Sequence, residues 1–281
     1  MKLLRFGPAG HEKPALLDAS GTVRDLSEVI DDIHGPVLSA DQLDKLRTID
    51  PESLPAVVPD RIGPCVGDVG KFICVGLNYS DHAAESGMAE PAEPILFMKA
   101  TSAICGPNDD VIIPPGATKA DWEVELGVVI GTEARYVSEA DALSHIAGCC
   151  VVNDVSEREH QLYRGGQWVK GKSADTFGPT GPWLVTLDEI ADLQDLNLWL
   201  EVDGERMQDG STSDMIFGVA HLVSHISQFM TLKPGDIIAT GTPAGVGMGW
   251  KPEPRYLRAG QTVKLGIAGL GEQVQKMVSA D

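Results

Sequence analysis

Residues 121–130 read Asp-Trp-Glu-Val-Glu-Leu-Gly-Val-Val-Ile, and this stretch decides the fold that the sequence predicts. Polar and apolar residues alternate in its first half and a β-branched run follows, which is the pattern of a strand. Side chains two positions apart on a strand point to the same face, so Glu123 and Glu125 would stand side by side, roughly 7 Å apart. Trp122, Val124 and Leu126 would face the other way.

A pair of carboxylates that faces a protein interior needs a partner. Glu123 and Glu125 would repel each other there and raise each other's pKa. A hard divalent cation such as Mg²⁺ or Mn²⁺ removes that conflict, because it prefers oxygen ligands. Asp154 adds a third carboxylate at the end of a second apolar strand, predicted over residues 149–155. Together the three would leave positions of the ion open to water and substrate. The alternative is a solvated strand face, on which Glu-x-Glu is common.

Length and composition describe an acidic globular chain. It has 281 residues, of which 43% are hydrophobic, and its formal net charge of −19 argues against binding to nucleic acid or to an anionic membrane. An anionic substrate would therefore need local cations to hold it. The chain has no apolar run of about 18 residues and no signal-peptide pattern at its start. Its five cysteines lack CxxC spacing, which indicates reduced core residues. We therefore expect a cytoplasmic protein.

The sequence predicts a small α+β N-terminal domain with a linker over residues 1–65 and a mostly β catalytic domain over residues 66–281. Short strands are expected at 2–6, 15–18 and 22–26. Ser39 and Gln42 match a capping box for a helix that would end at Asp50-Pro51. Prolines then stiffen the linker, at Pro51, Pro55, Pro59 and Pro64. This first unit should pack on the main domain and carry no chemistry.

A histidine and a glutamate lie three residues apart after the first predicted strand of the main domain, residues 71–76. A short helix from Ser80 or Asp81 to Gly87 would place His82 and Glu85 on one face. A carboxylate beside an imidazole orients it and raises its basicity, as in a general base. The alternative is a surface His–Glu pair. The following residues 88–94, rich in proline and acid, could form a mobile lid.

The rest of the chain predicts short strands with few helices, which favours a mostly β main domain. Helices are expected from Ser138 to near Gly148 and over residues 217–230. A hairpin is expected over 196–208, and strands over 236–240 and 263–267, the last closing the sheet. Gly241 to Gly247 would allow close backbone approach to a ligand.

Two motifs suggest other chemistry. Residues 166–173 match the P-loop pattern G-x-x-x-x-G-K-[ST], but a polar segment precedes them and Gly178-Pro179 stands where the helix should run, so we reject a nucleotide site. Lys172 remains of interest as a cation near the carboxylates. His221 and His225 have the i, i+4 spacing of zinc ligands, but His-Glu-x-x-His is absent and a packed helix is the preferred interpretation.

Several motifs, taken in order over residues 70 to 270, resemble those of the fumarylacetoacetate hydrolase family. They are Gly76-Leu77-Asn78-Tyr79 with His82 and Glu85, Glu123-Val124-Glu125, Asn153-Asp154-Val155-Ser156-Glu157-Arg158, Lys170-Gly171-Lys172-Ser173 with Asp175-Thr176, and Thr240-Gly241-Thr242-Pro243. The resemblance implies a mixed β-sandwich roll and a homodimer. It also implies one Mg²⁺ or Mn²⁺ per subunit on Glu123, Glu125 and Asp154.

The same resemblance implies catalytic roles for His82, Glu85 and Lys172. Substrate contacts would come from Arg158, Gln161, Thr242 and Tyr79. The implied reaction is hydrolysis of a carbon–carbon bond in a small anionic 2,4-dioxo acid. Such acids include acylpyruvates, such as maleylpyruvate or fumarylpyruvate, and 2,4-diketo-3-deoxy sugar acids. Alternatives are decarboxylation of oxaloacetate or a related β-keto acid, a ureidoglycolate lyase-like activity, and ligand binding without catalysis.

Overall fold

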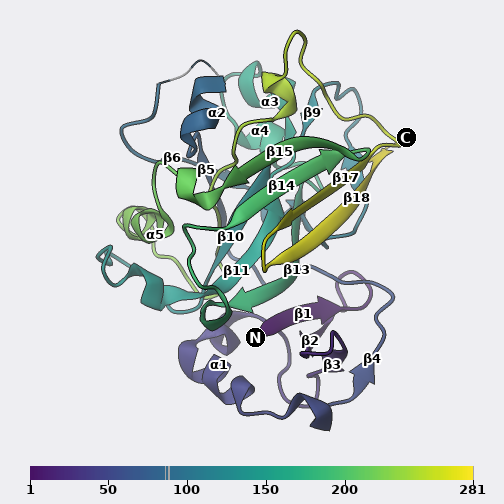
Figure 1. The fold of residues 1–281 in the computed structure, drawn as a ribbon, viewed down its shortest axis with the longest axis vertical. Coiled ribbons are helices and arrows are strands. Elements are labelled where there is room, and N and C mark those ends of the chain that lie inside the picture. Colours follow the sequence, from purple (N-terminus) through teal and green to yellow (C-terminus); the bar gives the residue numbers. More distant parts are fainter. Residues whose placement is uncertain (86, 88, 281) are drawn as a thin grey trace.

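The computed structural model describes residues 1–85, 87 and 89–280, and β-strands dominate it (Figure 1). The larger sheet has eleven strands among the described residues. Ten of them follow the order β4 (Ala56–Val57), β3 (Val23–Asp25), β2 (Lys13–Leu17), β1 (Lys2–Phe6), β13 (Gly178–Thr186), β11 (Ile146–Asn153), β10 (Val124–Ile130), β16 (Ile237–Ala239), β5 (Phe72–Gly76) and β6 (Ile95–Lys99). The eleventh strand, β7 (Ile104–Cys105), pairs with β13.

A second sheet packs against the larger one. Its five described strands follow the order β15 (Glu205–Ser211), β14 (Asn197–Val202), β17 (Thr262–Ile267), β18 (Gly271–Ser279) and β8 (Val111–Ile113). The α-helices are short: α1 (Ala40–Arg47), α2 (Ser80–Glu85), α3 (Arg158–Leu162), α4 (Val169–Lys172) and α5 (Val219–Ser227). Single 3₁₀ turns lie at Gly35–Leu38, Pro51–Ser53, Thr101–Ala103, Ala142–His145, Leu187–Glu189, Thr212–Asp214 and Gly247–Gly249. The prediction of a mostly β fold with few helices is confirmed.

Strand β10 explains how the sheets pack. Val124, Leu126 and Val128 point into the apolar core that the two sheets share. Val129 points to the opposite face and packs in a second core, with Leu3 and Leu184. A strand covered on both faces needs apolar residues at consecutive positions, and the run after Glu125 supplies them.

The predicted strand over residues 121–130 is interrupted at Trp122 and Glu123. Residues Ala120–Asp121 form β9 and pair with β12 (Ser156–Glu157), whereas β10 pairs with β11 and β16. Where the partner changes, side-chain oxygens accept from two backbone N–H groups. The Glu123 N–H donates to Asn153 Oδ1, and the Val124 N–H donates to Gln208 Oε1. The alternation of faces survives the break, since Trp122 lies in the core and Glu123 lines a cavity.

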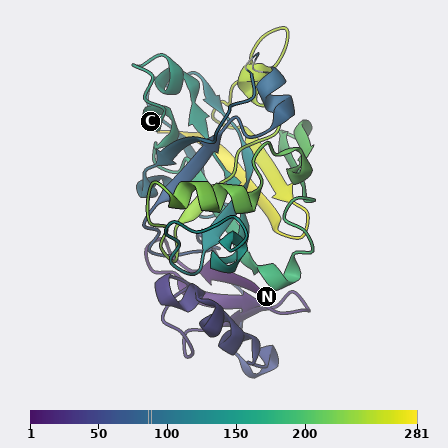
Figure 2. The same cartoon turned by 90° about the vertical axis from the view of Figure 1, so that its left-hand side faces the viewer.

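The first strands extend the larger sheet, because β1 pairs antiparallel with β13. Figure 2 shows this N-terminal unit at one end of an elongated molecule, with α2 near the other end. The capping box was wrong, since Ser39 makes no side-chain cap to α1, and the helix ends at Arg47, before Asp50-Pro51. The domain boundary near residue 65 stays a prediction.

Two predicted elements differ from the structure. The helix expected from Ser138 is a 3₁₀ turn over Ala142–His145, because Ile146 already begins β11 and long-range pairing with β10 and β13 prevails. Strand β17 does not close a sheet, because β18 follows and pairs along its other edge.

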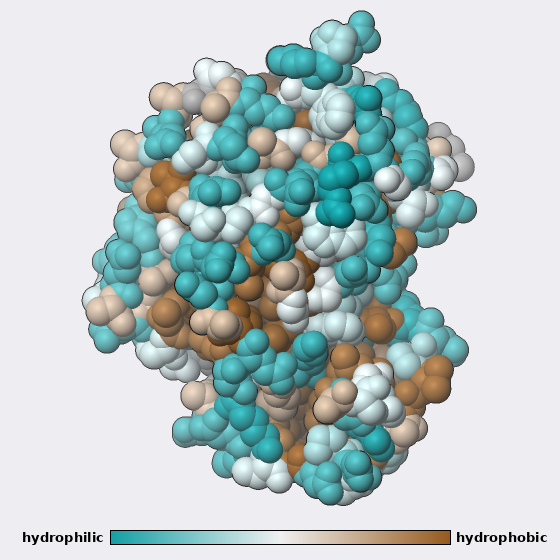
Figure 3. Space-filling view, viewed as in Figure 1, coloured by the Kyte–Doolittle hydropathy of each residue, from teal (hydrophilic) through white to brown (hydrophobic). Residues whose placement is uncertain are grey.

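None of the described helices is long and apolar enough to cross a membrane. The face in Figure 3 is largely hydrophilic, with apolar patches around the waist above the N-terminal unit.

Candidate metal centre and active site

Three buried carboxylates converge where β10 and β11 lie side by side. The two strands pair with Val124 opposite Asn153, so Glu123 and Asp154 are neighbours, and the Asp154 N–H donates to the Glu123 carbonyl at 2.9 Å. One carboxylate oxygen from each of Glu123, Glu125 and Asp154 lies within 4.8 Å of the others. The solvated-face alternative for Glu-x-Glu is therefore wrong, since all three residues are buried.

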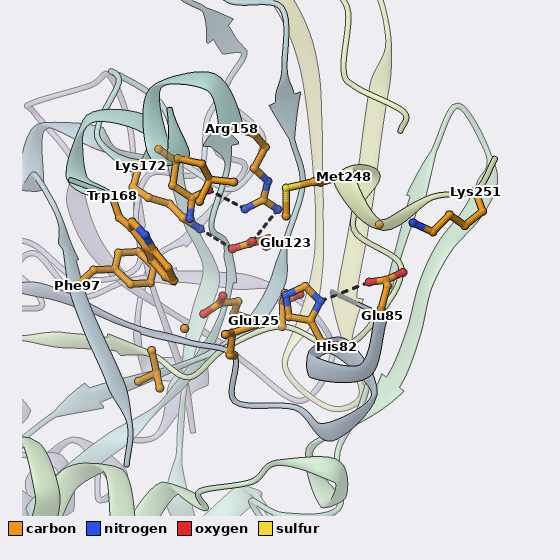
Figure 4. A pocket seen from close by; sticks show the side chains of 17 residues that line it. His82, Glu85, Phe97, Glu123, Glu125, Arg158, Trp168, Lys172, Met248 and Lys251 are labelled. Atoms are coloured by element: carbon orange, nitrogen blue, oxygen red, sulfur yellow. Dashed lines mark hydrogen bonds and ion pairs between the residues drawn. The ribbon is translucent and has the colours of Figure 1, made fainter. Parts of the chain in front are cut away.

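Buried cations surround two of the three carboxylates. Lys172 Nζ donates to Glu123 Oε2 at 2.6 Å (Figure 4). It also donates to Asp154 Oδ2 at 2.8 Å. Lys99 Nζ donates to the other oxygen of Asp154 and to the Val155 carbonyl at 2.9 Å. These contacts leave Asp154 held by two ammonium groups.

Arg158 links Glu123 to a further carboxylate. Its Nη2 lies 2.8 Å from Glu123 Oε1, and its Nε donates to Asp121 Oδ2 at 2.8 Å. Its Nη1 donates to Gln161 Oε1 at 3.0 Å. Each nitrogen of the guanidinium is thus engaged, which makes Arg158 a support for Glu123.

The two glutamates of the predicted pair differ in charge environment. Burial alone would raise the pKa of Glu123, but Lys172 and Arg158 outweigh it and hold that pKa well below its usual range. Burial raises the pKa of Glu125, and the charges of Asp154 and Glu123 raise it further. Burial lowers the pKa of Lys172, but Asp154 and Glu123 outweigh that effect and raise it to about 12. Lys172 is therefore a permanent cation near neutral pH.

Glu125 shows that the donor set fits a divalent cation. Its carboxylate accepts a hydrogen bond from the Gly241 N–H, at 2.8 Å, and no described side-chain cation pairs with it. A buried carboxylate without a cation is costly, and an ion shared with Glu123 and Asp154 would neutralise it. The three ligands offer only oxygen, which suits Mg²⁺ or Mn²⁺ better than zinc.

His82 and Glu85 lie against the same cavity as the carboxylates. His82 Nδ1 is 3.3 Å from Glu85 Oε2, and the Gly245 N–H donates to both oxygens of Glu85 at 3.1 Å. His82 is only 7% exposed, so the alternative of a solvated surface pair is wrong. The imidazole is oriented by Glu85, and Glu85 is fixed by the loop that follows β16.

The cavity itself has a volume of about 360 Å³ and combines charged and apolar walls. Phe97 and Trp168 meet edge to face, with ring centroids 5.2 Å apart, and Lys172 Nζ lies 4.9 Å from the centre of the Phe97 ring. Met248 lines the cavity from the loop after β16. The sequence analysis missed these apolar residues because nothing in their local pattern separates a cavity wall from a core position.

The predicted substrate contacts are only partly brought together. Gln161 and Arg158 line the cavity. Thr242 lines it too, but its hydroxyl donates to the Val124 carbonyl at 2.9 Å and accepts from Gln208 at 2.7 Å. Tyr79 does not line the cavity. It is fully buried in the core between the sheets.

The alternative motifs do not form sites. No helix follows Ser173, since the chain runs through turns into β13, so the P-loop geometry is absent from this described segment. Among the described residues, the group whose ligand atoms converge as a metal site requires is the carboxylate cluster, and neither His221 nor His225 belongs to it. The lid predicted for residues 88–94 is not tested, because Met88 lies outside the described residues.

Comparisons with known proteins identify the family of this chain. A family model described as the C-terminal region of fumarylacetoacetate (FAA) hydrolase matches residues 71–278. A Burkholderia cenocepacia protein named "Putative hydrolase Bcen2424_5521" is 64% identical over 277 residues, which cover 98% of each chain. The chain belongs to the fumarylacetoacetate hydrolase family.

Solved structures extend the comparison to two kinds of enzyme. A fumarylacetoacetate hydrolase from Exiguobacterium antarcticum is 34% identical over 99% of both chains, with a TM-score of 0.86. A 2-hydroxyhepta-2,4-diene-1,7-dioate isomerase from Mycobacterium marinum is 33% identical over 100% of this chain and 99% of its own, with a TM-score of 0.75. The chain is thus similar to both hydrolases and isomerases.

Proposed function

We propose that this protein is a divalent-metal-dependent hydrolase that cleaves the C3–C4 bond of a 2,4-dioxo acid. The products are pyruvate, or another 2-oxo acid, and a carboxylic acid. Acylpyruvates such as maleylpyruvate or fumarylpyruvate, and 2,4-diketo-3-deoxy sugar acids, are the proposed substrates. The observation that carries the proposal is that the carboxylates Glu123 and Glu125 and the His82–Glu85 pair line one cavity. One Mg²⁺ or Mn²⁺ per subunit, a homodimer and a cytoplasmic location belong to the same proposal.

His82 would act as the general base. Its imidazole takes a proton from water, whose oxygen attacks the C4 carbonyl, and Glu85 holds the ring and stabilises the imidazolium. The C3–C4 bond then breaks, its electrons form the enolate of the 2-oxo acid, and C3 takes up a proton. Bound to Glu123, Glu125 and Asp154, the metal ion would supply a Lewis acid for the substrate oxygens.

Lys172 would stabilise negative charge. Its raised pKa keeps the ammonium protonated near neutral pH, so it is unsuited to act as a base. A fixed cation beside a developing enolate in a buried site is worth more than one in water, because the local dielectric constant is low. The ring of Phe97 shields this ammonium on one side.

Isomerisation of an unsaturated dicarboxylic acid is a second candidate, favoured by the name of the Mycobacterium marinum relative. It needs a proton moved by the same base but breaks no carbon–carbon bond. Release of pyruvate from an acylpyruvate therefore separates the two candidates. Decarboxylation of oxaloacetate also releases pyruvate, but it needs no attacking water.

The test is kcat/KM for an acylpyruvate and for oxaloacetate, with metal saturating. His82→Ala should lower acylpyruvate cleavage by at least about 100-fold, since general bases contribute 10²–10⁴-fold. Any activity on oxaloacetate should fall much less. Glu85→Gln should follow the same trend more weakly, because Glu85 orients the base. If acylpyruvate cleavage survives His82→Ala, or if oxaloacetate is by far the better substrate, the hydrolase proposal is wrong.

A further inference from the structure

Among the described residues, the lysine and arginine side chains that line the cavity are Arg158, Lys172 and Lys251. Arg158 and Lys172 are each paired with buried carboxylates. Lys251 also lines the cavity, but no described residue gives its ammonium a hydrogen bond or an ion pair. Lys251 is therefore the lining cation that remains available to a ligand.

Lys251 stands at the far side of the cavity from the aromatic wall. Figure 4 shows Phe97 and Trp168 on one side, the carboxylates and His82 in the middle, and Lys251 beyond Glu85, with its ammonium turned toward the other labelled side chains. A ligand that spans the cavity would therefore place one end near this ammonium.

The loop that carries Lys251 is held by its neighbours. Asp121 Oδ1 accepts from the Gly247 N–H at 2.7 Å and its Oδ2 from the Met248 N–H at 3.0 Å. Trp250 Nε1 donates to the Gly245 carbonyl at 3.3 Å, and the Arg255 guanidinium lies 4.1 Å from the centre of the Trp250 ring. These contacts hold the backbone beside Lys251. Its side chain is exposed and also lines the cavity, so it stands at the cavity mouth.

We infer that Lys251 selects substrates whose acyl end carries a carboxylate, an inference that rests on the proposed function. The 2-oxo acid end belongs at Glu123, Glu125 and Asp154, and C4 must lie near His82. An acyl chain that continues past His82 and Glu85 ends at Lys251. Because the chain has a net charge of −19, its overall field repels a second carboxylate, and an unpaired ammonium at the mouth offsets that repulsion.

The test uses a matched pair of substrates: fumarylpyruvate, and the same compound with its acyl-end carboxylate converted to the methyl ester. The measured quantity is the ratio of kcat/KM for the diacid to that for the ester, at low and high salt. Lys251→Met should lower this ratio by about fivefold at low salt, chiefly through KM, the size expected for a solvent-accessible ion pair. The difference should shrink as salt rises.

Two further variants complete the experiment. Lys251→Arg should restore the ratio, because it returns the charge. Lys233→Met makes the same change in net charge at an exposed lysine before β16 and should leave the ratio as in the wild type. An unchanged ratio in Lys251→Met, or an equal fall in Lys233→Met, overturns the role of Lys251 while leaving the hydrolase proposal intact. If the wild type cleaves neither compound, the inference about Lys251 fails together with the proposal that acylpyruvates are substrates.

Discussion

Two regions carry residues at spacings common in metal sites, and they differ in burial and in how their donor atoms are brought together. Glu123, Glu125 and Asp154 are buried and their oxygens converge from neighbouring strands. His221 and His225 lie on one helix, α5, where their rings stack with centroids 5.9 Å apart. The side chain of His221 is 40% exposed, and its Nδ1 lies 3.2 Å from a carboxylate oxygen of Glu139.

The contrast shows that local spacing is a weak guide to a metal site. An i, i+4 pair on a helix brings two rings together whether or not a ligand is bound. A cation site needs donors that long-range strand pairing brings together, and burial that makes unpaired carboxylates costly. Glu125 is buried and pairs with no described side-chain cation, so it meets that condition. The half-buried histidines of α5 do not.

The largest expected effect is on metal binding at the carboxylates. Glu125→Gln removes a charged ligand, so we expect Mn²⁺ affinity, measured by calorimetry, to fall at least about 100-fold. Loss of a residue that only supports a metal ligand costs about 10–100-fold in affinity. Most activity should be lost with it. Chelator should inactivate the wild type, and Mg²⁺ or Mn²⁺ should restore it. Full turnover in excess chelator, with no metal found by elemental analysis, would contradict the metal assignment.

A smaller but still large effect is expected at Lys172. Lys172→Ala removes the cation that Glu123 and Asp154 share but leaves them Arg158 and Lys99, so it should destabilise the metal-free protein by about 1.5–3 kcal/mol. Saturating Mg²⁺ should recover part of that loss, because the ion would compensate the same carboxylates. The value of kcat should also fall strongly, measured with metal saturating. Micromolar affinity for ATP in the wild type, by calorimetry, would instead revive the P-loop interpretation.

The smallest effect is expected on α5. His221→Ala and His225→Ala should change the free energy of unfolding by about 0.5 kcal/mol or less, as for most surface substitutions. Both variants should keep wild-type kcat/KM and Mn²⁺ affinity. Denaturant unfolding and the acylpyruvate assay check these outcomes. A loss of stoichiometric zinc or of activity in either variant would reverse the comparison between the two regions.

Strand β18 shows where sequence reasoning about the fold fails. Its buried positions include Gln273 and Gln275, while Val274 between them is exposed, the reverse of the usual pattern. The buried amides are satisfied from elsewhere, because Gln273 donates to the Val151 carbonyl and Gln275 to the Pro107 carbonyl. The faces of the chain around β10 could be predicted because polar and apolar residues alternate there. In β18, residue polarity does not indicate which positions are buried.

The candidate site was predictable in the same uneven way. Glu123 and Glu125 stand out because alternation places both on one face. Lys99 and Asp121 had no assigned role, yet Lys99 holds Asp154, and Asp121 joins Arg158 to the loop after β16. These contacts span 55, 37 and 126 residues of sequence, respectively, and depend on pairing that no local pattern encodes.

The placement of groups on strands and on loops has an evolutionary consequence. Glu125 lies within a central strand, where a substitution disturbs the sheet, whereas Met248 and Lys251 stand on a surface loop that tolerates change more readily. If the proposed function is right, variation in that loop would alter the range of accepted acids while the carboxylates and His82 stay unchanged. A mutant library confined to Met248 and Lys251, which spares Gly249, Trp250 and Arg255, would sample new specificities at little cost to folding.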